Sequence, residues 1–131
     1  MTATNNSNKT GIEVSIIMPA LNEEKNICLA INNSLKAFED FNINGEIVVI
    51  DDGSQDNTAD ITEEISRKDK RVNLFKHEAT GGFGASFWDG VDKACGKTIT
   101  MLPGDNEGDP WEILRYYKLL EQVDIIIPFI F

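Results

Sequence analysis

Glu46-Ile-Val-Val-Ile-Asp-Asp-Gly-Ser54 is a short, almost continuous apolar run that ends in two aspartates, a glycine and a serine. A β-branched run of this length is typical of a strand buried on both faces of a parallel sheet. The Asp-Asp-Gly-Ser sequence after it consists of residues that favour turns. Residues 46–50 are therefore predicted to be a strand that leads directly into a polar loop.

Similar apolar runs recur along the chain, and segments with helical periodicity separate them. The predicted strands are residues 14–18, 46–50, 72–75, 98–102 and 124–127. The predicted helices begin after Asn22, after residues 56–58, after Gly84 and at residue 110 or 111, and they end near residues 42, 71, 96 and 121. This strict alternation predicts an α/β fold, a Rossmann-like parallel sheet with helices on both faces.

The composition is that of one acidic domain. The chain has 131 residues, of which 41% are hydrophobic, enough for one core. Its formal net charge of -10 argues against nucleic acid or an anionic membrane as a partner. Residues 1–12 are predicted to be a disordered leader and residues 13–131 the domain. Residues 1–10 lack a signal peptide and no apolar run reaches the roughly 20 residues of a membrane span, so we expect a cytoplasmic protein. Cys28 and Cys95 lie within predicted helices and are expected to be buried and reduced.

Polar residues gather after the predicted strands, where open α/β sheets bind their ligands. The loops after residues 18, 50, 75 and 102 contain several glycines together with Glu23, Asp51, Asp52, Asp105 and Glu107. Asp51 and Asp52 are common turn formers, but a carboxylate just past a buried strand can also accept hydrogen bonds from a base or a ribose. Their place at the carboxyl edge favours a nucleoside site.

The loop after the fourth predicted strand reads Pro103-Gly-Asp-Asn-Glu-Gly-Asp-Pro110. Carboxylates are the hard oxygen ligands that Mg²⁺ and Mn²⁺ prefer, which makes Asp105 and Glu107 candidate metal ligands. The alternative is a solvated acidic loop. Asp109 is instead predicted to cap the next helix, because Pro110 suits the first helical position.

Three glycines within residues 81–84 precede a predicted helix. They are either a phosphate cradle or a point of close contact between helix and sheet. His77 is the single histidine and has no carboxylate or nucleophile beside it in the sequence, so it is predicted to be a surface residue without a role. The larger aromatic residues are predicted to belong to the core, namely Phe87, Trp88 and Trp111.

Three phrases in order resemble the start of family 2 glycosyltransferases. They are Val14-Ser-Ile-Ile-Met-Pro-Ala-Leu-Asn-Glu-Glu24, Ile47-Val-Val-Ile-Asp-Asp-Gly-Ser-Gln-Asp56 and Gly81-Gly-Phe-Gly-Ala-Ser-Phe-Trp-Asp-Gly90. The chain is similar to dolichol-phosphate mannose synthases and polyprenol-phosphate glycosyltransferases from about residue 14 to residue 127. This resemblance implies a GT-A fold. It also implies transfer of a sugar, with inversion, from a nucleotide-diphosphate sugar to an acceptor such as a polyprenyl phosphate or a glycan.

The resemblance also implies which residues bind the donor. It assigns nucleotide binding to Pro19, Glu23, Asp51, Asp52 and Gly82. It assigns Mg²⁺ or Mn²⁺ to Asp105 and Glu107, with Pro103 where the family has the first aspartate of its Asp-x-Asp motif. The catalytic base, the acceptor site and any membrane contact are expected beyond Phe131, so the 131 residues by themselves are expected to be inactive.

Two other classes of protein stay open. A nucleotide-binding module that has lost catalysis would account for Pro103 in the metal motif. A phospho-receiver domain has a similar length and alternation, but it needs its acidic pair after the first strand rather than the second. The apolar residues 125–131 of this chain predict association into homo-oligomers.

Overall fold

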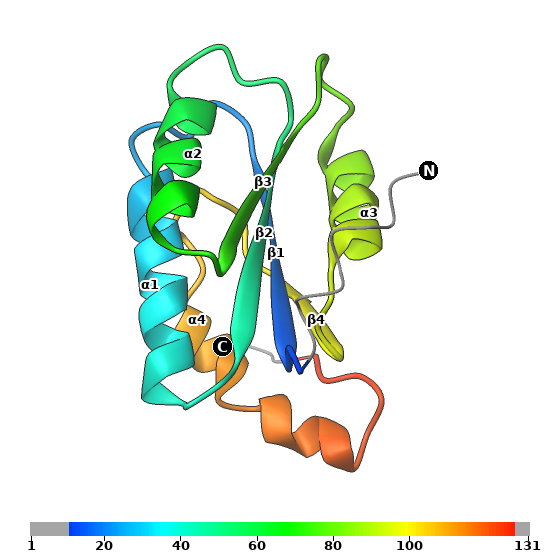
Figure 1. Ribbon diagram of the computed structural model, residues 1–131. Helices are drawn as coiled ribbons and strands as arrows, with labels where there is room; N and C mark the ends of the chain where they lie inside the picture. Colours follow the sequence, from blue (N-terminus) through cyan, green and yellow to red (C-terminus); the bar gives the residue numbers. More distant parts are fainter. Residues whose placement is uncertain (1–10, 128–131) are drawn as a thin grey trace.

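The computed structural model describes residues 11–127, which form a four-stranded parallel sheet with helices on both faces (Figure 1). The strands are β1 (Val14–Ala20), β2 (Gly45–Asp51), β3 (Val72–Lys76) and β4 (Thr98–Met101). They lie in the order β3-β2-β1-β4. The predicted α/β class is confirmed. The order also differs from the 2-1-3-4-5 arrangement of receiver-like folds, which argues against that alternative.

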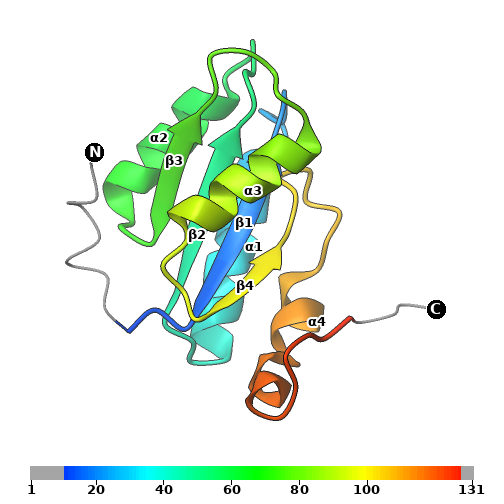
Figure 2. The ribbon, with the colours of Figure 1, turned by 90° about the vertical axis from the view of Figure 1, so that its right-hand side faces the viewer.

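Helices cover the sheet unequally. α1 (Ile27–Asp40), α2 (Thr58–Lys68) and α4 (Pro110–Leu114) lie on one face, and α3 (Phe83–Lys93) lies on the other (Figures 1 and 2). Asp109 accepts hydrogen bonds from the first amides of α4, so its predicted capping role is confirmed. Within the described residues, no helix is long and apolar enough to cross a bilayer.

The two central strands are buried on both faces, as their unbroken apolar sequences predict. All seven residues of β1 and all seven of β2 are buried. Because successive side chains of a strand point to opposite faces, Ile16 and Ile47 pack in the core on the side of α1, whereas Ile17 and Val48 pack on the side of α3. The alternation therefore produces two separate apolar layers from the same strands.

The chain after β4 departs from the sequence prediction in two ways. The predicted helix over residues 110–121 is divided into α4 and a 3₁₀ helix, Tyr117–Glu121. Tyr117 donates a hydrogen bond to Glu13 Oε1 near the start of β1, a contact that draws the second segment toward the sheet. The predicted strand at residues 124–127 is wrong, because these residues pair with no described strand. An apolar run alone does not specify pairing.

Several side chains predicted to be buried are exposed. Trp88 is 66% exposed, because Ser86 and Gly90 are the positions of α3 that face the sheet and Trp88, two residues from each, lies on the opposite side of the helix. Cys28 is exposed and Cys95 is half-buried, so the prediction of two core cysteines is wrong. Both residues lie outside the apolar faces of their segments.

The ends of the chain leave two predictions open. The leader prediction falls mostly on residues 1–10, outside the described residues, while Ile12 is buried and its carbonyl accepts a hydrogen bond from Lys97 N. Ile125 and Ile127 are 75% and 74% exposed, respectively. Homo-oligomer formation through this apolar segment stays a prediction.

A first prediction concerns the contact of α3 with the sheet. A Cβ added at Gly90 would overlap Ile17 Cγ2 on β1, whereas a Cβ added at Gly84 in the same helix would meet no atom within 4 Å. We expect Gly90→Ala to lower the free energy of unfolding by about 1–3 kcal/mol through overpacking. We expect Gly84→Ala to raise it by about 0.5–1 kcal/mol, because alanine favours the helix. Urea denaturation measures both, and equal effects of the two substitutions would contradict the close packing.

Candidate functional site

The sheet order brings three of the predicted loops to one edge. β1 lies between β2 and β4, so the loops that follow these three strands are neighbours at the carboxyl end of the sheet. The direction of chain progression reverses between β1 and β4, the topological switch point at which open α/β sheets bind ligands. Pro19 and Asp51 lie at the ends of β1 and β2, and Asp105 lies in the loop after β4.

Hydrogen bonds join the loop after β1 to the loop after β2. Asn22 N donates to Ser54 Oγ at 2.9 Å, Gln55 N donates to Asn22 Oδ1 at 2.9 Å, and Glu23 N donates to Thr58 Oγ1 at 2.8 Å. Asn22 therefore does not cap α1, which begins five residues later, but links the two loops. This link places Glu23 beside the start of α2, and its carboxylate is half-buried.

The loop after β4 is attached to the end of β1. Gly104 N donates to the carbonyl of Pro19 at 2.9 Å, and the next residue is the metal candidate Asp105. Glu107 N donates to Asp105 Oδ1 at 3.0 Å, so one oxygen of this carboxylate already accepts a hydrogen bond from within the loop. Pro19 thus contributes its backbone carbonyl to the position of the metal loop.

The donor set of this loop fits a cation that shares its ligands with a phosphate. In the described part of the chain no group of three His, Cys, Asp or Glu residues is arranged to hold a metal by itself. Mg²⁺ is commonly bound by one or two carboxylates, with phosphate oxygens and water as the other ligands. Asp105 and Glu107 match that pattern, and Pro103 contributes no side-chain oxygen.

The acidic pair after β2 is divided between two environments. Asp51 is 3% exposed, and within residues 11–127 its carboxylate accepts one long hydrogen bond, from Ser54 N at 3.3 Å. Asp52 is 4% exposed and accepts from Gly81 N at 2.8 Å and from Gly82 N at 2.9 Å. Asp51 consequently retains more capacity to accept hydrogen bonds from a ligand, whereas Asp52 holds the glycine loop.

His77 lies between two carboxylates and its side chain is 22% exposed, so the prediction of a surface residue is wrong. Its Nδ1 is 2.8 Å from Asp52 Oδ1, and its Nε2 is 2.9 Å from Asp89 Oδ2 on α3. The hydrogen bonds that the ring makes to Asp52 and then to Asp89 raise the pKa of His77 above its usual value, although burial opposes them. Burial tends to raise the pKa of Asp52, but hydrogen bonds from Gly81, His77 and Gly82 lower it overall.

Sequence reasoning missed these contacts because the partners are far apart along the chain. Asp52 is 25 residues before His77, and Asp89 is 12 residues after it. A signal was nevertheless present, because Asp52 follows β2 and His77 follows the neighbouring strand β3. The carboxyl ends of adjacent parallel strands lie at the same edge.

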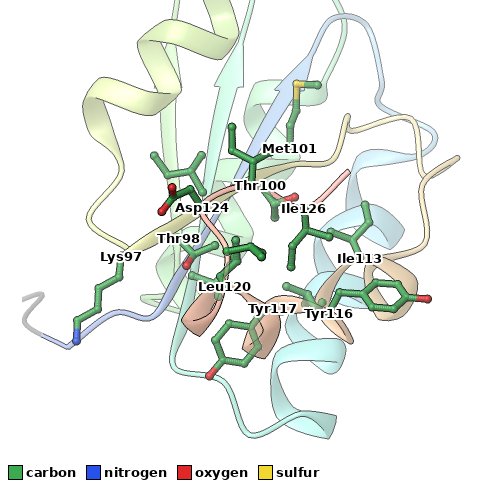
Figure 3. A pocket seen from close by; sticks show the side chains of 15 residues that line it. Lys97, Thr98, Thr100, Met101, Ile113, Tyr116, Tyr117, Leu120, Asp124 and Ile126 are labelled. Carbon is green, nitrogen blue, oxygen red and sulfur yellow. The ribbon is translucent and has the colours of Figure 1, made fainter. Parts of the chain in front are cut away.

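A cavity of about 510 Å³ lies away from this edge, beside β4 (Figure 3). Its lining combines β4, α4 and the segment after the 3₁₀ helix, including Thr98, Thr100, Ile113, Tyr117 and Ile126. None of the residues predicted to bind the nucleotide or the metal lines it. The size of this cavity therefore gives no support for placing the donor there.

Known proteins share this architecture. The chain matches S. aureus TarS, solved with UDP-GlcNAc, with a TM-score of 0.68 and 26% identity over 84% of this chain and 31% of TarS. It matches the mannosyltransferase PcManGT from Pyrobaculum calidifontis, solved with GDP-Man and Mn²⁺, with a TM-score of 0.62 and 20% identity over 71% of this chain and 27% of PcManGT. The fold is that of the nucleotide-binding part of GT-A glycosyltransferases.

The family follows from the sequence comparisons. The family model described as Glycosyl transferase family 2 matches residues 15–131, so the chain belongs to that family. A dolichyl-phosphate beta-glucosyltransferase of Trichomonas vaginalis is 31% identical over 74% of this chain and 31% of its own length. An uncharacterized protein of Methanocaldococcus jannaschii is 36% identical over 82% of this chain. The chain spans 47% of that protein and thus less than half of either relative.

A second prediction concerns Asp56, which joins the loops at the site. Its carboxylate accepts hydrogen bonds from Thr58 N at 3.0 Å and from Glu24 N at 3.2 Å. Asn57 is beside it, but its side chain makes no capping hydrogen bond. We expect Asp56→Ala to lower the free energy of unfolding by about 1–2 kcal/mol. Asn57→Ala should change it by less than about 0.5 kcal/mol.

The pH dependence of these two variants provides the check. Burial favours a higher pKa for Asp56, but the hydrogen bonds to Thr58 and Glu24 make its pKa lower than in an unfolded chain. A lowered pKa stabilises the fold above the unfolded value of about 3.9, and this contribution is lost as the pH falls through the folded value. Urea titrations between pH 7 and pH 3 should show the difference between the two variants shrinking in acid. A constant difference would contradict the role of the ionised carboxylate.

Proposed function

We propose that this chain is the donor-binding part of a glycosyltransferase that uses a nucleotide-diphosphate sugar. The observation that carries the proposal is that Pro19, Asp51 and the loop that contains Asp105 lie at the adjacent carboxyl ends of β1, β2 and β4. Ligands of open α/β sheets bind at this position. TarS, which has the same fold at 26% identity, was solved with UDP-GlcNAc.

In this proposal the acidic residues of the site have different roles. Asp51, whose carboxylate accepts one long hydrogen bond within residues 11–127, accepts further hydrogen bonds from the nucleoside, and Glu23 lies in the loop after β1 that is bonded to the start of α2. Asp52 acts through the glycine loop that it holds, at Gly81 and Gly82. The amides of that loop are thereby fixed near the start of α3.

A divalent cation completes the proposed donor site. An acidic chain with a formal net charge of -10 repels a diphosphate unless a cation neutralises it locally. Asp105 and Glu107 would hold Mg²⁺ or Mn²⁺, which would neutralise the diphosphate and stabilise it as a leaving group. PcManGT, which shares the fold, was solved with Mn²⁺. Pro103 leaves this chain with fewer protein ligands and therefore with weaker metal binding.

The third prediction tests the donor site directly. Titration calorimetry with UDP and with GDP should detect binding in the presence of Mn²⁺ or Mg²⁺ and weaker binding with a chelator. Because a hydrogen bond to a charged group is lost, Asp51→Asn should weaken the affinity about tenfold or more. Asp105→Asn should reduce the difference between metal and chelator.

The matched control is Glu112→Gln, which removes a carboxylate from the exposed surface of α4, where it pairs with Arg115. Its affinity should equal that of the unchanged chain. Equal affinities with metal and with chelator would remove the metal from the proposal. Full affinity in Asp51→Asn would remove Asp51 from the nucleoside site.

We propose further that the longer protein transfers the sugar to a polyprenyl phosphate or a glycan with inversion. The dolichyl-phosphate beta-glucosyltransferase of Trichomonas vaginalis, which is 31% identical, supports the first of these acceptors. Direct displacement at the anomeric carbon requires a base that deprotonates the acceptor and a site that orients it. Because the chain spans 47% and 31% of two relatives, we expect both in a region that corresponds to the rest of their length. A non-catalytic nucleotide-binding module is the alternative, and Pro103 is the residue that favours it.

The fourth prediction distinguishes these alternatives. The longer protein, given UDP- or GDP-sugars and polyprenyl phosphate, should form a glycolipid whose anomeric configuration is opposite to that of the donor. The 131-residue chain should bind nucleotide but form no product. Mass spectrometry and NMR identify the product. If the longer protein binds nucleotide without turnover, the chain is part of a non-catalytic nucleotide-binding module. If the 131 residues by themselves turn over the donor, the expectation that the base lies outside them is wrong.

A further inference from the structure

The imidazole of His77 connects the end of β2 with the middle of α3 through hydrogen bonds to two side chains. The backbone of His77 is fixed first, because its N–H donates to the carbonyl of Asp51 at 2.9 Å. The ring then reaches Asp52 Oδ1 at 2.8 Å and Asp89 Oδ2 at 2.9 Å. The end of β2 and the middle of α3 are joined through one side chain.

The same aspartate holds the glycine loop. Asp52 accepts from Gly81 N and Gly82 N, and a Cβ at Gly81 would lie 3.8 Å from His77 Nδ1, so the ring lies directly beside the loop. Gly82 has a φ of 95°, a left-handed conformation that favours glycine. A loop in this conformation depends on neighbours that restrain it. Asp52 provides that restraint, and His77 fixes Asp52.

The protonation state of the His77 ring decides whether it can donate hydrogen bonds to both Asp52 and Asp89. A neutral imidazole has one N–H and can donate to one carboxylate, whereas an imidazolium donates to both. The charged groups around the ring are Asp52 from the end of β2 and Asp89 from α3, with Lys93 3.9 Å from Asp89. Two carboxylates face one ring, and the side chain of His77 is 22% exposed. This arrangement favours the imidazolium.

We propose that His77 is a positioning residue that, as an imidazolium, holds Asp52 and Asp89 together and thereby fixes the Gly81–Gly82 loop at the donor site. Its effect on donor affinity rests on the function proposed above. His77 contacts no donor atom in this proposal. It acts on the loop through Asp52 and on the start of α3 through Asp89.

The direction of the pH dependence follows from the geometry. The two aspartates raise the pKa of His77 above its ordinary value of 6.5. A raised pKa gives stabilisation that is complete below the unfolded value and lost as the pH rises through the folded value. Protection of the loop, and with it donor affinity, should therefore decrease as the pH rises above about 6.5.

Two measurements on the same chain test the proposal. Hydrogen exchange followed by NMR reports the protection of the Gly81 and Gly82 amides without any donor. Calorimetry with UDP or GDP and Mn²⁺ reports affinity across the same pH range. His77→Gln, which cannot become charged, should lose the protection and weaken donor binding about tenfold, because charge-assisted hydrogen bonds are lost. Asp89→Asn should move the midpoint of both pH profiles to lower pH.

Glu78→Gln is the matched control, because Glu78 follows His77 directly and is exposed. It should leave both profiles unchanged. Unchanged protection of the glycine amides in His77→Gln, or an unmoved midpoint in Asp89→Asn, would overturn the proposal, since packing alone would lower affinity without moving a midpoint. If neither nucleotide binds at any pH while protection still follows His77, the proposed function fails and the positioning role stands.

Discussion

Two buried carboxylates of β2 hold α3 against the sheet, and the arrangement of the site depends on them. Glu46, near the start of the strand, is 1% exposed and accepts from Cys95 N, just after α3. Asp52, just after the strand, accepts from the two glycine amides before α3. Burying a carboxylate is costly unless hydrogen bonds satisfy it. Backbone amides at both ends of one helix help to satisfy these two carboxylates, and the helix is positioned as a result.

At the carboxyl edge of the sheet, the site is organised by hydrogen bonds between loops. The loop after β1 is bonded to the loop after β2 through Asn22, and Pro19 is bonded to the loop after β4. Three segments that are distant in sequence therefore form one connected rim. A rim that is already ordered loses less conformational entropy when a ligand binds. The connected loops and the restrained glycine loop together suit a flexible, charged ligand such as a nucleotide diphosphate.

Most of the fold was predictable from local patterns, and the failures have a common cause. Continuous β-branched runs predicted β1 and β2, and helical spacing of apolar residues such as Ile27 and Ile31 predicted α1. The apolar run at residues 124–127 resembles the buried strands in composition, yet it pairs with no described strand. Trp88 likewise had the composition of a core residue but lies on the outer side of α3. Apolar character indicates that burial is favourable, but the neighbour that provides it must come from elsewhere in the chain.

The sequence by itself determined the class of fold, the edge of the sheet that carries the polar loops, and the residues after each strand, because these follow from spacing along the chain. Only the tertiary structure decided which hydrogen bonds each of those side chains makes. Within residues 11–127 it left the Asp51 carboxylate with a single long hydrogen bond, assigned that of Asp52 to the glycine loop, and placed His77 between Asp52 and Asp89. Hydrogen bonds act over about 3 Å in space, and residues separated by 12 or 25 positions meet only when the sheet order brings their strands together.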